Sequence, residues 1–417
     1  MSQTFRIRKG FDVVIGGVPK QIIGTAQSVH SISLLGTDYP GLTLRPQLKP
    51  GAVVAVGEAV LVDRHSAVVV PSPVNGVVRA VTRGPHRSVE VVTIDITGAS
   101  TRASQLGSSG TAALRELLHR SGLWTAFRTR PFGVIPKADS TPDAVLVTAM
   151  DTSPLAVDPA AALKGMEDDL ARGVDAMGAL TEGPVFVCQG PGPPLVASIR
   201  PNTRTVCFDG PHPAGLPSTH IHHLAPVGDG RVVWHIGWQE VAAIGRLLST
   251  GELVNERVVA IGGPGAREPR LVRTVIGANL DDLMRNEVGE GPCRVVSGSP
   301  LHGREGSWLG RFDTQISVLD AARPESGLPF LSRLLGIRPR APAPVIPLPD
   351  LARAEVAGVP AVPLLRALSI GDAETAASLG CLALAEEDMA LLSYLCVSGA
   401  DYAAMLRTVL DDLALDA

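Results

Sequence analysis

Three histidines lie in one irregular stretch of the chain, and imidazole is the side chain best suited to proton transfer and metal binding near neutral pH. The stretch runs from Gly210 to His222 and contains His212, His220 and His222 together with three prolines and two glycines. Prolines and glycines fix an irregular backbone that a plain connector would not need. We therefore expect an interface or a ligand site here, and expect His212→Ala and His220→Ala to weaken that role while leaving thermal stability almost unchanged.

Two of these histidines could ligate a metal ion if the run formed a strand. His220 and His222 are two residues apart, so on a strand they would face the same way, with His223 on the other side. The run supplies no convincing third ligand, and protein metal sites usually have at least three. Polar packing or an interface is therefore the favoured interpretation, and no metal site is predicted.

A second candidate site mixes aromatic rings with cations. Trp124 and Phe132 bracket Arg128 and Arg130, a combination that suits docking to a protein or to a flat ring with polar atoms. The alternative is a helix end whose rings pack on their own domain while the arginines stay solvated. The residues alone leave both interpretations open.

The composition of the chain argues against several classes of function. The net charge is -4 and no block of Lys and Arg stands out, which argues against nucleic-acid binding. No signal peptide is present and no apolar run reaches the ~18 to 20 residues that cross a bilayer, so a cytoplasmic chain is expected. Five scattered cysteines, none spaced C-x-x-C, fit a reducing compartment and argue against a thiolate-bound zinc or iron–sulfur cluster.

The candidate residues must be positioned by several domains, because 417 residues are too many for a single core. Residues 1–98 are predicted to form a barrel-sandwich hybrid domain, since residues 43–82 carry short Val-rich runs separated by turns. The pattern resembles biotinyl and lipoyl carriers, whose modified lysine lies at a hairpin tip. His65 takes that position here and cannot form the amide link, so we expect the domain to stay unmodified.

Residues 112–256 are predicted to form a Rossmann-like, doubly wound α/β domain. The expected elements are helices near 112–123, 159–175 and 238–248 and strands near 143–150 and 185–189. No G-x-G-x-x-G follows the first strand, so dinucleotide binding is not predicted. Residues 99–111, rich in Ala, Ser, Thr and Gly, are predicted to be a linker.

Short strands at 258–261 and 271–275 predict a small, mainly β domain over residues 257–320. The Gly262–Gly265 turn lacks the ending of a P-loop, which favours a tight turn over a phosphate cradle. Residues 339–349 are proline-dense and are predicted to be a connector. Residues 361–417 are predicted to be a helical C-terminal region.

Several unusual segments resemble, in order and over nearly the whole chain, the A subunit of the sodium-translocating NADH:quinone oxidoreductase (Na⁺-NQR) of bacterial membranes. The chain departs from that family at 321–362, where it is shortened, and at Val397-Ser398, where the family usually continues Pro-Gly-Lys. The matching segments are Lys9–Asp12, Leu34–Gly36, Ser121–Phe132, Val147–Thr152, the Gly210–His222 run, Thr250–Leu253, Pro269–Thr274, Leu309–Phe312, Gly380–Leu382 and Glu386–Asp388.

The resemblance implies a β-grasp fold for residues 257–320 and a peripheral subunit on the inner face of the cell membrane. It also implies partner subunits, above all the membrane subunits, which carry the flavins and iron–sulfur centres, with no redox cofactor and no autonomous activity in this chain. The complex would couple ubiquinone reduction to Na⁺ export. The candidates for an interface or a quinone site are Trp124, Arg128, Arg130, Phe132, His212, His220 and His222. The alternative is a stand-alone protein, derived from that family, whose β-grasp domain binds a small ligand.

Overall fold

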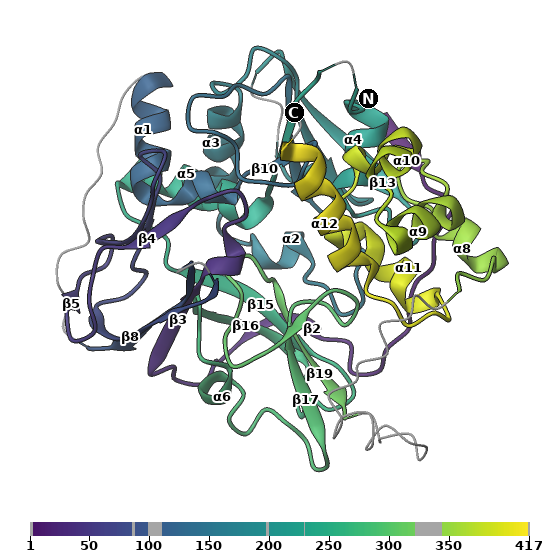
Figure 1. Ribbon diagram of the computed structural model, residues 1–417. Coiled ribbons are helices and arrows are strands. Elements are labelled where there is room, and N and C mark those ends of the chain that lie inside the picture. Colours follow the sequence, from purple (N-terminus) through teal and green to yellow (C-terminus); the bar gives the residue numbers. More distant parts are fainter. Residues whose placement is uncertain are drawn as a thin grey trace.

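The computed structural model of the chain describes residues 3–85, 88–98, 111–196, 200–228, 230–321 and 344–415. Three sheet-based parts and a helical part pack against one another (Figure 1). Residues 99–110 of the predicted linker and 339–343 of the predicted connector lie outside the described residues.

Short β-branched strands form the predicted barrel-sandwich. Val60, Val78 and Ile94 fill its interior, and His65 lies in the turn between two strands, as expected of a hairpin tip. One sheet has the order β3 (Ser31–Leu35), β9 (Val89–Ile96), β8 (Gly76–Arg83) and β5 (Val53–Val54), and the other has β4 (Leu44–Pro46), β6 (Ala59–Asp63) and β7 (Val69–Pro71).

The α/β domain is built on a six-stranded sheet that is parallel except at β10. Leu146 and Phe186 pack under α4 (Pro217–Leu224), whereas Val145 and Val187 belong to the core that includes α3 (Glu167–Met177) and α5 (Trp238–Thr250). Helices on both faces confirm the doubly wound arrangement. The strand order is β1 (Gln3–Arg6), β13 (Thr203–Asp209), β12 (Val185–Gln189), β11 (Ala144–Ala149), β14 (Val233–Gly237) and β10 (Arg128–Arg130).

The shorter helices of this domain differ in detail from the prediction. The expected helix over 159–175 is two helices, α2 (Pro159–Ala162) and α3, because Gly165 takes a φ of +82° between them. The helix expected at 112–123 is α1 (Thr111–Ser121), and a 3-10 turn, η3 (Leu123–Ala126), continues the chain toward β10.

A mixed six-stranded sheet forms the third part. Val259, Val272 and Ile316 pack with Leu283 of α6 (Leu280–Leu283) in its core. The sheet order is β18 (Arg304–Glu305), β17 (Cys293–Ser297), β19 (Gln315–Asp320), β15 (Glu256–Gly262), β16 (Arg270–Val275) and β2 (Lys20–Gly24).

Residues 3–24, although they lie within the domain predicted at 1–98, contribute no strand to the two sheets of the sandwich. β1 pairs in parallel with β13, and β2 pairs in parallel with β16, so this segment connects two other domains (purple in Figure 1). The edge strand of a sheet has unpaired backbone N–H and C=O groups that can hydrogen-bond an extended segment. The pattern of Val-rich runs does not show which sheet edges are open, so it could not predict these pairings.

The helical C-terminal part has its own apolar core, which includes Leu351, Leu365 and Leu406. It begins before the predicted residue 361 and packs beside α4 (yellow-green in Figure 1). Its elements are α8 (Pro349–Arg353), α9 (Ala361–Ile370), α10 (Ala373–Leu379), η4 (Cys381–Ala383), η5 (Glu386–Met389), α11 (Ala390–Leu395) and α12 (Tyr402–Leu415).

Candidate functional site

The carboxyl ends of the parallel strands form a hollow edge. In the sheet, β11, β12 and β13 lie side by side in chain order, whereas β14 pairs with the opposite edge of β11. The strand order therefore switches between β11 and β14. Ligands of open α/β sheets bind outside the carboxyl ends of the strands at such a switch. A cavity of about 230 Å³ lies at this point, lined by residues that include Thr148, Met150, His235 and Gly237. We call it the switch-point cavity.

A larger cavity of about 410 Å³ adjoins the switch-point cavity. The two share Met150, Asp151 and Val157 of the loop that follows β11. The larger one extends over the ends of β12 and β13 to Gln189 and Gly210. Gly210, the first residue of the histidine-bearing run, therefore lines this edge of the sheet.

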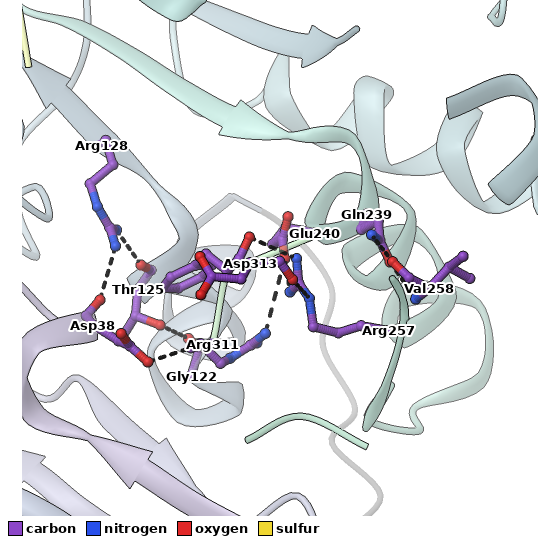
Figure 2. Close-up of polar contacts among 11 residues, drawn as sticks. Asp38, Gly122, Thr125, Arg128, Gln239, Glu240, Arg257, Val258, Arg311 and Asp313 are labelled. Atoms are coloured by element: carbon purple, nitrogen blue, oxygen red, sulfur yellow. Dashed lines mark hydrogen bonds and ion pairs between the residues drawn. The ribbon is translucent and has the colours of Figure 1, made fainter. Parts of the chain in front are cut away.

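Asp38 of the sandwich contacts Arg128 of the α/β domain and Arg311 of the mixed-sheet part (Figure 2), and we call the region where these three domains meet the junction. Asp38 ends η1 (Gly36–Asp38) of the sandwich, and its side chain is buried. Its Oδ1 accepts a hydrogen bond from Arg304 Nη2 at 2.6 Å, and its Oδ2 accepts one from the Arg311 backbone N–H at 2.8 Å. Its carbonyl oxygen accepts from Arg128 Nη2 at 2.9 Å. Burial raises the pKa of Asp38, and the charge of Arg304 opposes that rise.

A buried ion pair lies on the other side of the same junction. Arg257 Nη1 is 2.5 Å from Glu240 Oε1, and both side chains are almost fully enclosed. Glu240 stands in the first turn of α5 and Arg257 at the start of β15, so the pair ties the α/β domain to the mixed sheet. The amide of Gln239 hydrogen-bonds in both directions with the backbone of Val258 and reinforces this contact (Figure 2).

Two guanidinium groups lie close to the Phe312 ring at the cavity wall. The Cζ atoms of Arg128 and Arg311 are 4.7 and 5.1 Å from its ring centre. Arg128 and Phe312 both line the switch-point cavity. Burial lowers the pKa of Arg128 to about 10, so this side chain remains charged at neutral pH. The cavity therefore combines an aromatic face and apolar side chains with the cation of Arg128 and the acidic residues Asp151 and Glu240, which suits a flat ligand with polar atoms at its rim.

The structure places the residues of the predicted aromatic and cationic segment in different surroundings. Trp124 is fully buried, its ring meets Trp234 edge-on at 5.3 Å, and its Nε1 donates to the Pro136 carbonyl oxygen at 2.9 Å. It thus packs on its own domain, out of reach of a partner. Phe132 is half-buried, and its carbonyl oxygen accepts from Arg407 Nη1 of α12 at 2.8 Å.

Arg130 is buried rather than solvated, with 1% of its surface exposed. Its Nη1 lies 3.1 Å from His235 Nε2, and its Nη2 donates to Ser218 Oγ at 3.2 Å and to Glu387 Oε1 at 3.0 Å. Burial, reinforced by the charge of Arg130, lowers the pKa of His235 well below its usual value. Arg130 therefore connects the α/β domain to the C-terminal part.

The strand assumed for metal ligation by His220 and His222 is wrong, because residues 217–224 form helix α4 with Pro217 in its first turn. Residues two apart on a helix face different sides. His220 is buried against Phe208, and its Nε2 is 3.0 Å from the Ala214 carbonyl oxygen, whereas His222 is exposed. Across the described ranges, no three His, Cys, Asp or Glu side chains are grouped so as to hold a metal ion.

His212 is also buried, so the three histidines do not form one site. Its Nδ1 is 3.2 Å from Thr152 Oγ1, and its backbone N–H donates to Asp12 Oδ1 at 3.1 Å. Burial lowers the pKa of His212 to about 4 and that of His220 to about 3, so both imidazoles are neutral at physiological pH.

Sequence reasoning missed the residues that build the junction, namely Asp38, Glu240, Arg257, Arg304 and Arg311. A signal was present for two of them. Arg257 directly precedes the apolar run Val258–Ile261, and Glu240 stands in a helix whose other residues are mostly apolar. A charge in such a setting is buried and paired more often than a charge on a polar face.

Comparison with known proteins covers all three sheet-based parts. Family descriptions match residues 5–97 as the NqrA N-terminal barrel-sandwich hybrid domain, 110–253 as the NqrA second alpha/beta domain, and 258–307 as the NQRA C-terminal domain. The A subunit of the Na(+)-translocating NADH-quinone reductase of Shewanella amazonensis is 39% identical over 97% of this chain and 98% of its own length. The chain belongs to the NqrA family.

Other relatives agree. The proteins of the same name from Pseudomonas aeruginosa and Glaesserella parasuis are 38% and 36% identical, each over 98% of both chains. Among solved structures, an NAD⁺-reducing [NiFe]-hydrogenase in the H2-reduced state has 12% identity and a TM-score of 0.40, covering 73% of this chain and 61% of that one. Every helix in the described part of the chain is too short or too polar to span a bilayer.

Proposed function

We propose that this chain acts as a peripheral subunit, on the inner face of the cell membrane, of a sodium-pumping NADH:ubiquinone reductase. The complex couples quinone reduction to Na⁺ export, and its flavins and iron–sulfur centres reside in the other subunits. The supporting observation is the similarity to NqrA proteins over the whole length of both chains. In this proposal the α/β domain is Rossmann-like, the mixed sheet is a β-grasp domain, and neither carries a redox cofactor.

The placement of the cysteines supports a cofactor-free chain. Cys188, Cys207, Cys293, Cys381 and Cys396 lie on or beside five different elements, whereas an iron–sulfur cluster needs converging thiolates. Burial raises the pKa of Cys381 to about 11, which keeps that thiol protonated. The loop after β11, residues 150–158, contains no glycine, so the close backbone approach to a pyrophosphate made by the dinucleotide fingerprint is absent there.

Absorption spectroscopy and metal analysis of the isolated protein test this part of the proposal. The purified chain should be colourless and free of flavin and iron. A stoichiometric signal from either would overturn it.

The switch-point cavity is our candidate for quinone handling. Arg128 is the predicted candidate residue that lines it, and Trp238, Phe312 and Val157 give it apolar walls. A guanidinium can donate hydrogen bonds to the carbonyl oxygens of a quinone, while the ring lies against an aromatic face. Binding of a short-chain ubiquinone analogue can be measured by the quenching of tryptophan fluorescence, with Met150→Trp as a cavity-filling variant. Equal affinity of both proteins would place the quinone elsewhere.

A deletion strain tests the function itself. Without this gene, membranes should lose NADH-driven, Na⁺-dependent quinone reduction, and the wild-type gene should restore it. If membranes without the chain keep that activity, the alternative of a stand-alone ligand-binding protein is the better account.

A further inference from the structure

A buried polar cluster joins the C-terminal helical part to the α/β domain. Glu387 and Asp388 are adjacent residues of η5, and Arg130 reaches Glu387 from β10 at 3.0 Å. Asp388 Oδ2 accepts hydrogen bonds from Ser218 Oγ at 2.6 Å and from the Ala385 backbone N–H at 2.7 Å. Arg130, Ser218 and Asp388 are all almost completely excluded from solvent.

The cluster holds two carboxyl groups and one matching cation. Among the described residues, Arg130 is the cation within ion-pair distance of Glu387, and none is that close to Asp388. A negative charge on the buried Asp388, without a cation of its own and beside the half-buried Glu387, is costly, so the two adjacent carboxyls retain a proton between them. Within the described residues Asp388 is the group without a cation, and its Oδ1 is buried with no hydrogen-bond partner, so a negative charge on that oxygen would be unsatisfied.

We propose that the C-terminal helical part is docked on the α/β domain by a carboxyl pair that must hold one proton, so that docking weakens as the pH rises toward neutrality.

The direction of the effect follows from the pKa of each carboxyl. Burial, with the nearby charge of Glu387, raises the pKa of Asp388 to about 7. Although burial opposes it, the Arg130 guanidinium holds the pKa of Glu387 below its usual value. Once undocked, Asp388 ionises near its ordinary value of 3.8. Between these two values the docked form binds more protons, so docking is strongest at the acid end of the window and is lost by up to about tenfold per pH unit as the pH rises through it.

Other charged groups surround the cluster and contribute their own pH dependence. From the α/β side His235 lies beside Arg130, and His212 interacts electrostatically with His302; burial lowers the pKa of His235 and of His212. His302, between β17 and β18, acts electrostatically on Glu387, and Arg407 of α12 pairs with Glu386. A histidine that is neutral when buried gains a proton more easily once exposed, so the buried histidines favour undocking at low pH. Comparison of the wild type with a variant that lacks only the charge of Asp388 therefore separates the contribution of Asp388 from theirs.

Hydrogen exchange of the full-length chain measures docking directly. Amides of residues 361–415 are followed at pH 5 and pH 7.5, after correction for intrinsic exchange rates, in the wild type, in Asp388→Asn and in Asp412→Asn, a control at an exposed site on α12. Asparagine mimics the protonated acid. We expect the protection of Asp388→Asn relative to the wild type to be at least about tenfold greater at pH 7.5 than at pH 5, and the control to follow the wild type at both.

The same relative protection of Asp388→Asn at pH 7.5 as at pH 5 would overturn the proposal, as would a lower one at pH 7.5. Glu387→Gln provides a second test should the first variant not fold. Without the neighbouring charge, Arg130 can pair with Asp388 and lower its pKa in the docked form, so the loss of protection should be smaller and its midpoint should move to lower pH. An unchanged midpoint in Glu387→Gln would also contradict a shared proton.

Discussion

Ion pairs with at least one buried member connect the domains of this molecule to one another. Glu240 with Arg257, Asp38 with Arg304 and Arg130 with Glu387 each join residues from different parts of the chain. An ion removed from water costs several kcal/mol unless a partner lies in good geometry. Each pair therefore favours one relative placement of two domains.

Arg257→Met should destabilise the protein by about 3–5 kcal/mol, because it leaves Glu240 buried without its close partner. Arg311 Nη1, at 4.0 Å from Glu240, is too distant to replace the hydrogen bond. Adding Glu240→Gln to that variant should restore part of the loss. Urea unfolding measures both, with Arg294→Met as the control, since the pair of Arg294 with Glu305 is exposed and should contribute less than about 1 kcal/mol. Equal losses at the two arginines would contradict a structural role for the buried pair.

His220→Ala tests the corrected interpretation of the histidine-bearing run. The sequence predicted little change in stability, but the buried ring packs on Phe208 with centroids 4.4 Å apart and hydrogen-bonds the Ala214 carbonyl oxygen. We now expect His220→Ala to cost about 2–4 kcal/mol through a cavity and an unpaired carbonyl. Thermal unfolding should show His222→Ala, at an exposed site of the same helix, to be nearly neutral. An unchanged melting temperature for His220→Ala would return the residue to the list of interface candidates.

At the scale of elements, α3 and α5 pack with their backbones in close approach. A Cβ added to Gly173 would lie 1.9 Å from the Val241 carbonyl oxygen, and one added to Gly245 would lie 1.7 Å from that of Asp169. Neither position tolerates a side chain without moving a helix. This packing covers one face of the sheet whose carboxyl edge forms the switch-point cavity.

Gly245→Ala should therefore destabilise the chain by at least about 1–3 kcal/mol, although alanine normally favours a helix. Gly190→Ala is the matched control, because nothing lies within 4 Å of a Cβ added there. Chemical denaturation of the two variants gives the comparison. A stabilised Gly245→Ala would show that the two helices are farther apart than described.

Local sequence patterns predicted the strands and helices better than they predicted which strands pair with one another. The buried strand at 143–150 and the helix at 238–248 are confirmed as β11 and α5, because apolar composition and period are properties of a short segment. The pairing of β1 with β13 and of β2 with β16 depends on which sheet edges are left open, and that is a property of the assembled fold. The same limit applies to α4, since the run that was considered as a possible strand for metal ligation forms a short helix.

At the scale of the whole molecule, the candidate site lies where domains meet. Arg128 comes from the α/β domain, Asp38 from the sandwich and Phe312 from the mixed sheet, so no single stretch of sequence contains the site. The sequence did predict Arg128 as a candidate, through its place beside aromatic residues. It could not predict Asp38, whose role depends on a contact with Arg304 across 266 positions of the chain.

Membership of a complex is the central claim, and purification of the tagged chain from the membranes of its own host tests it most directly. We predict that, after mild detergent extraction, the chain co-elutes in fixed stoichiometry with membrane subunits that carry flavin and iron, and that the eluate reduces ubiquinone with NADH in a Na⁺-dependent manner. Elution of the chain alone, with the reductase activity left in the unbound fraction, would contradict the account.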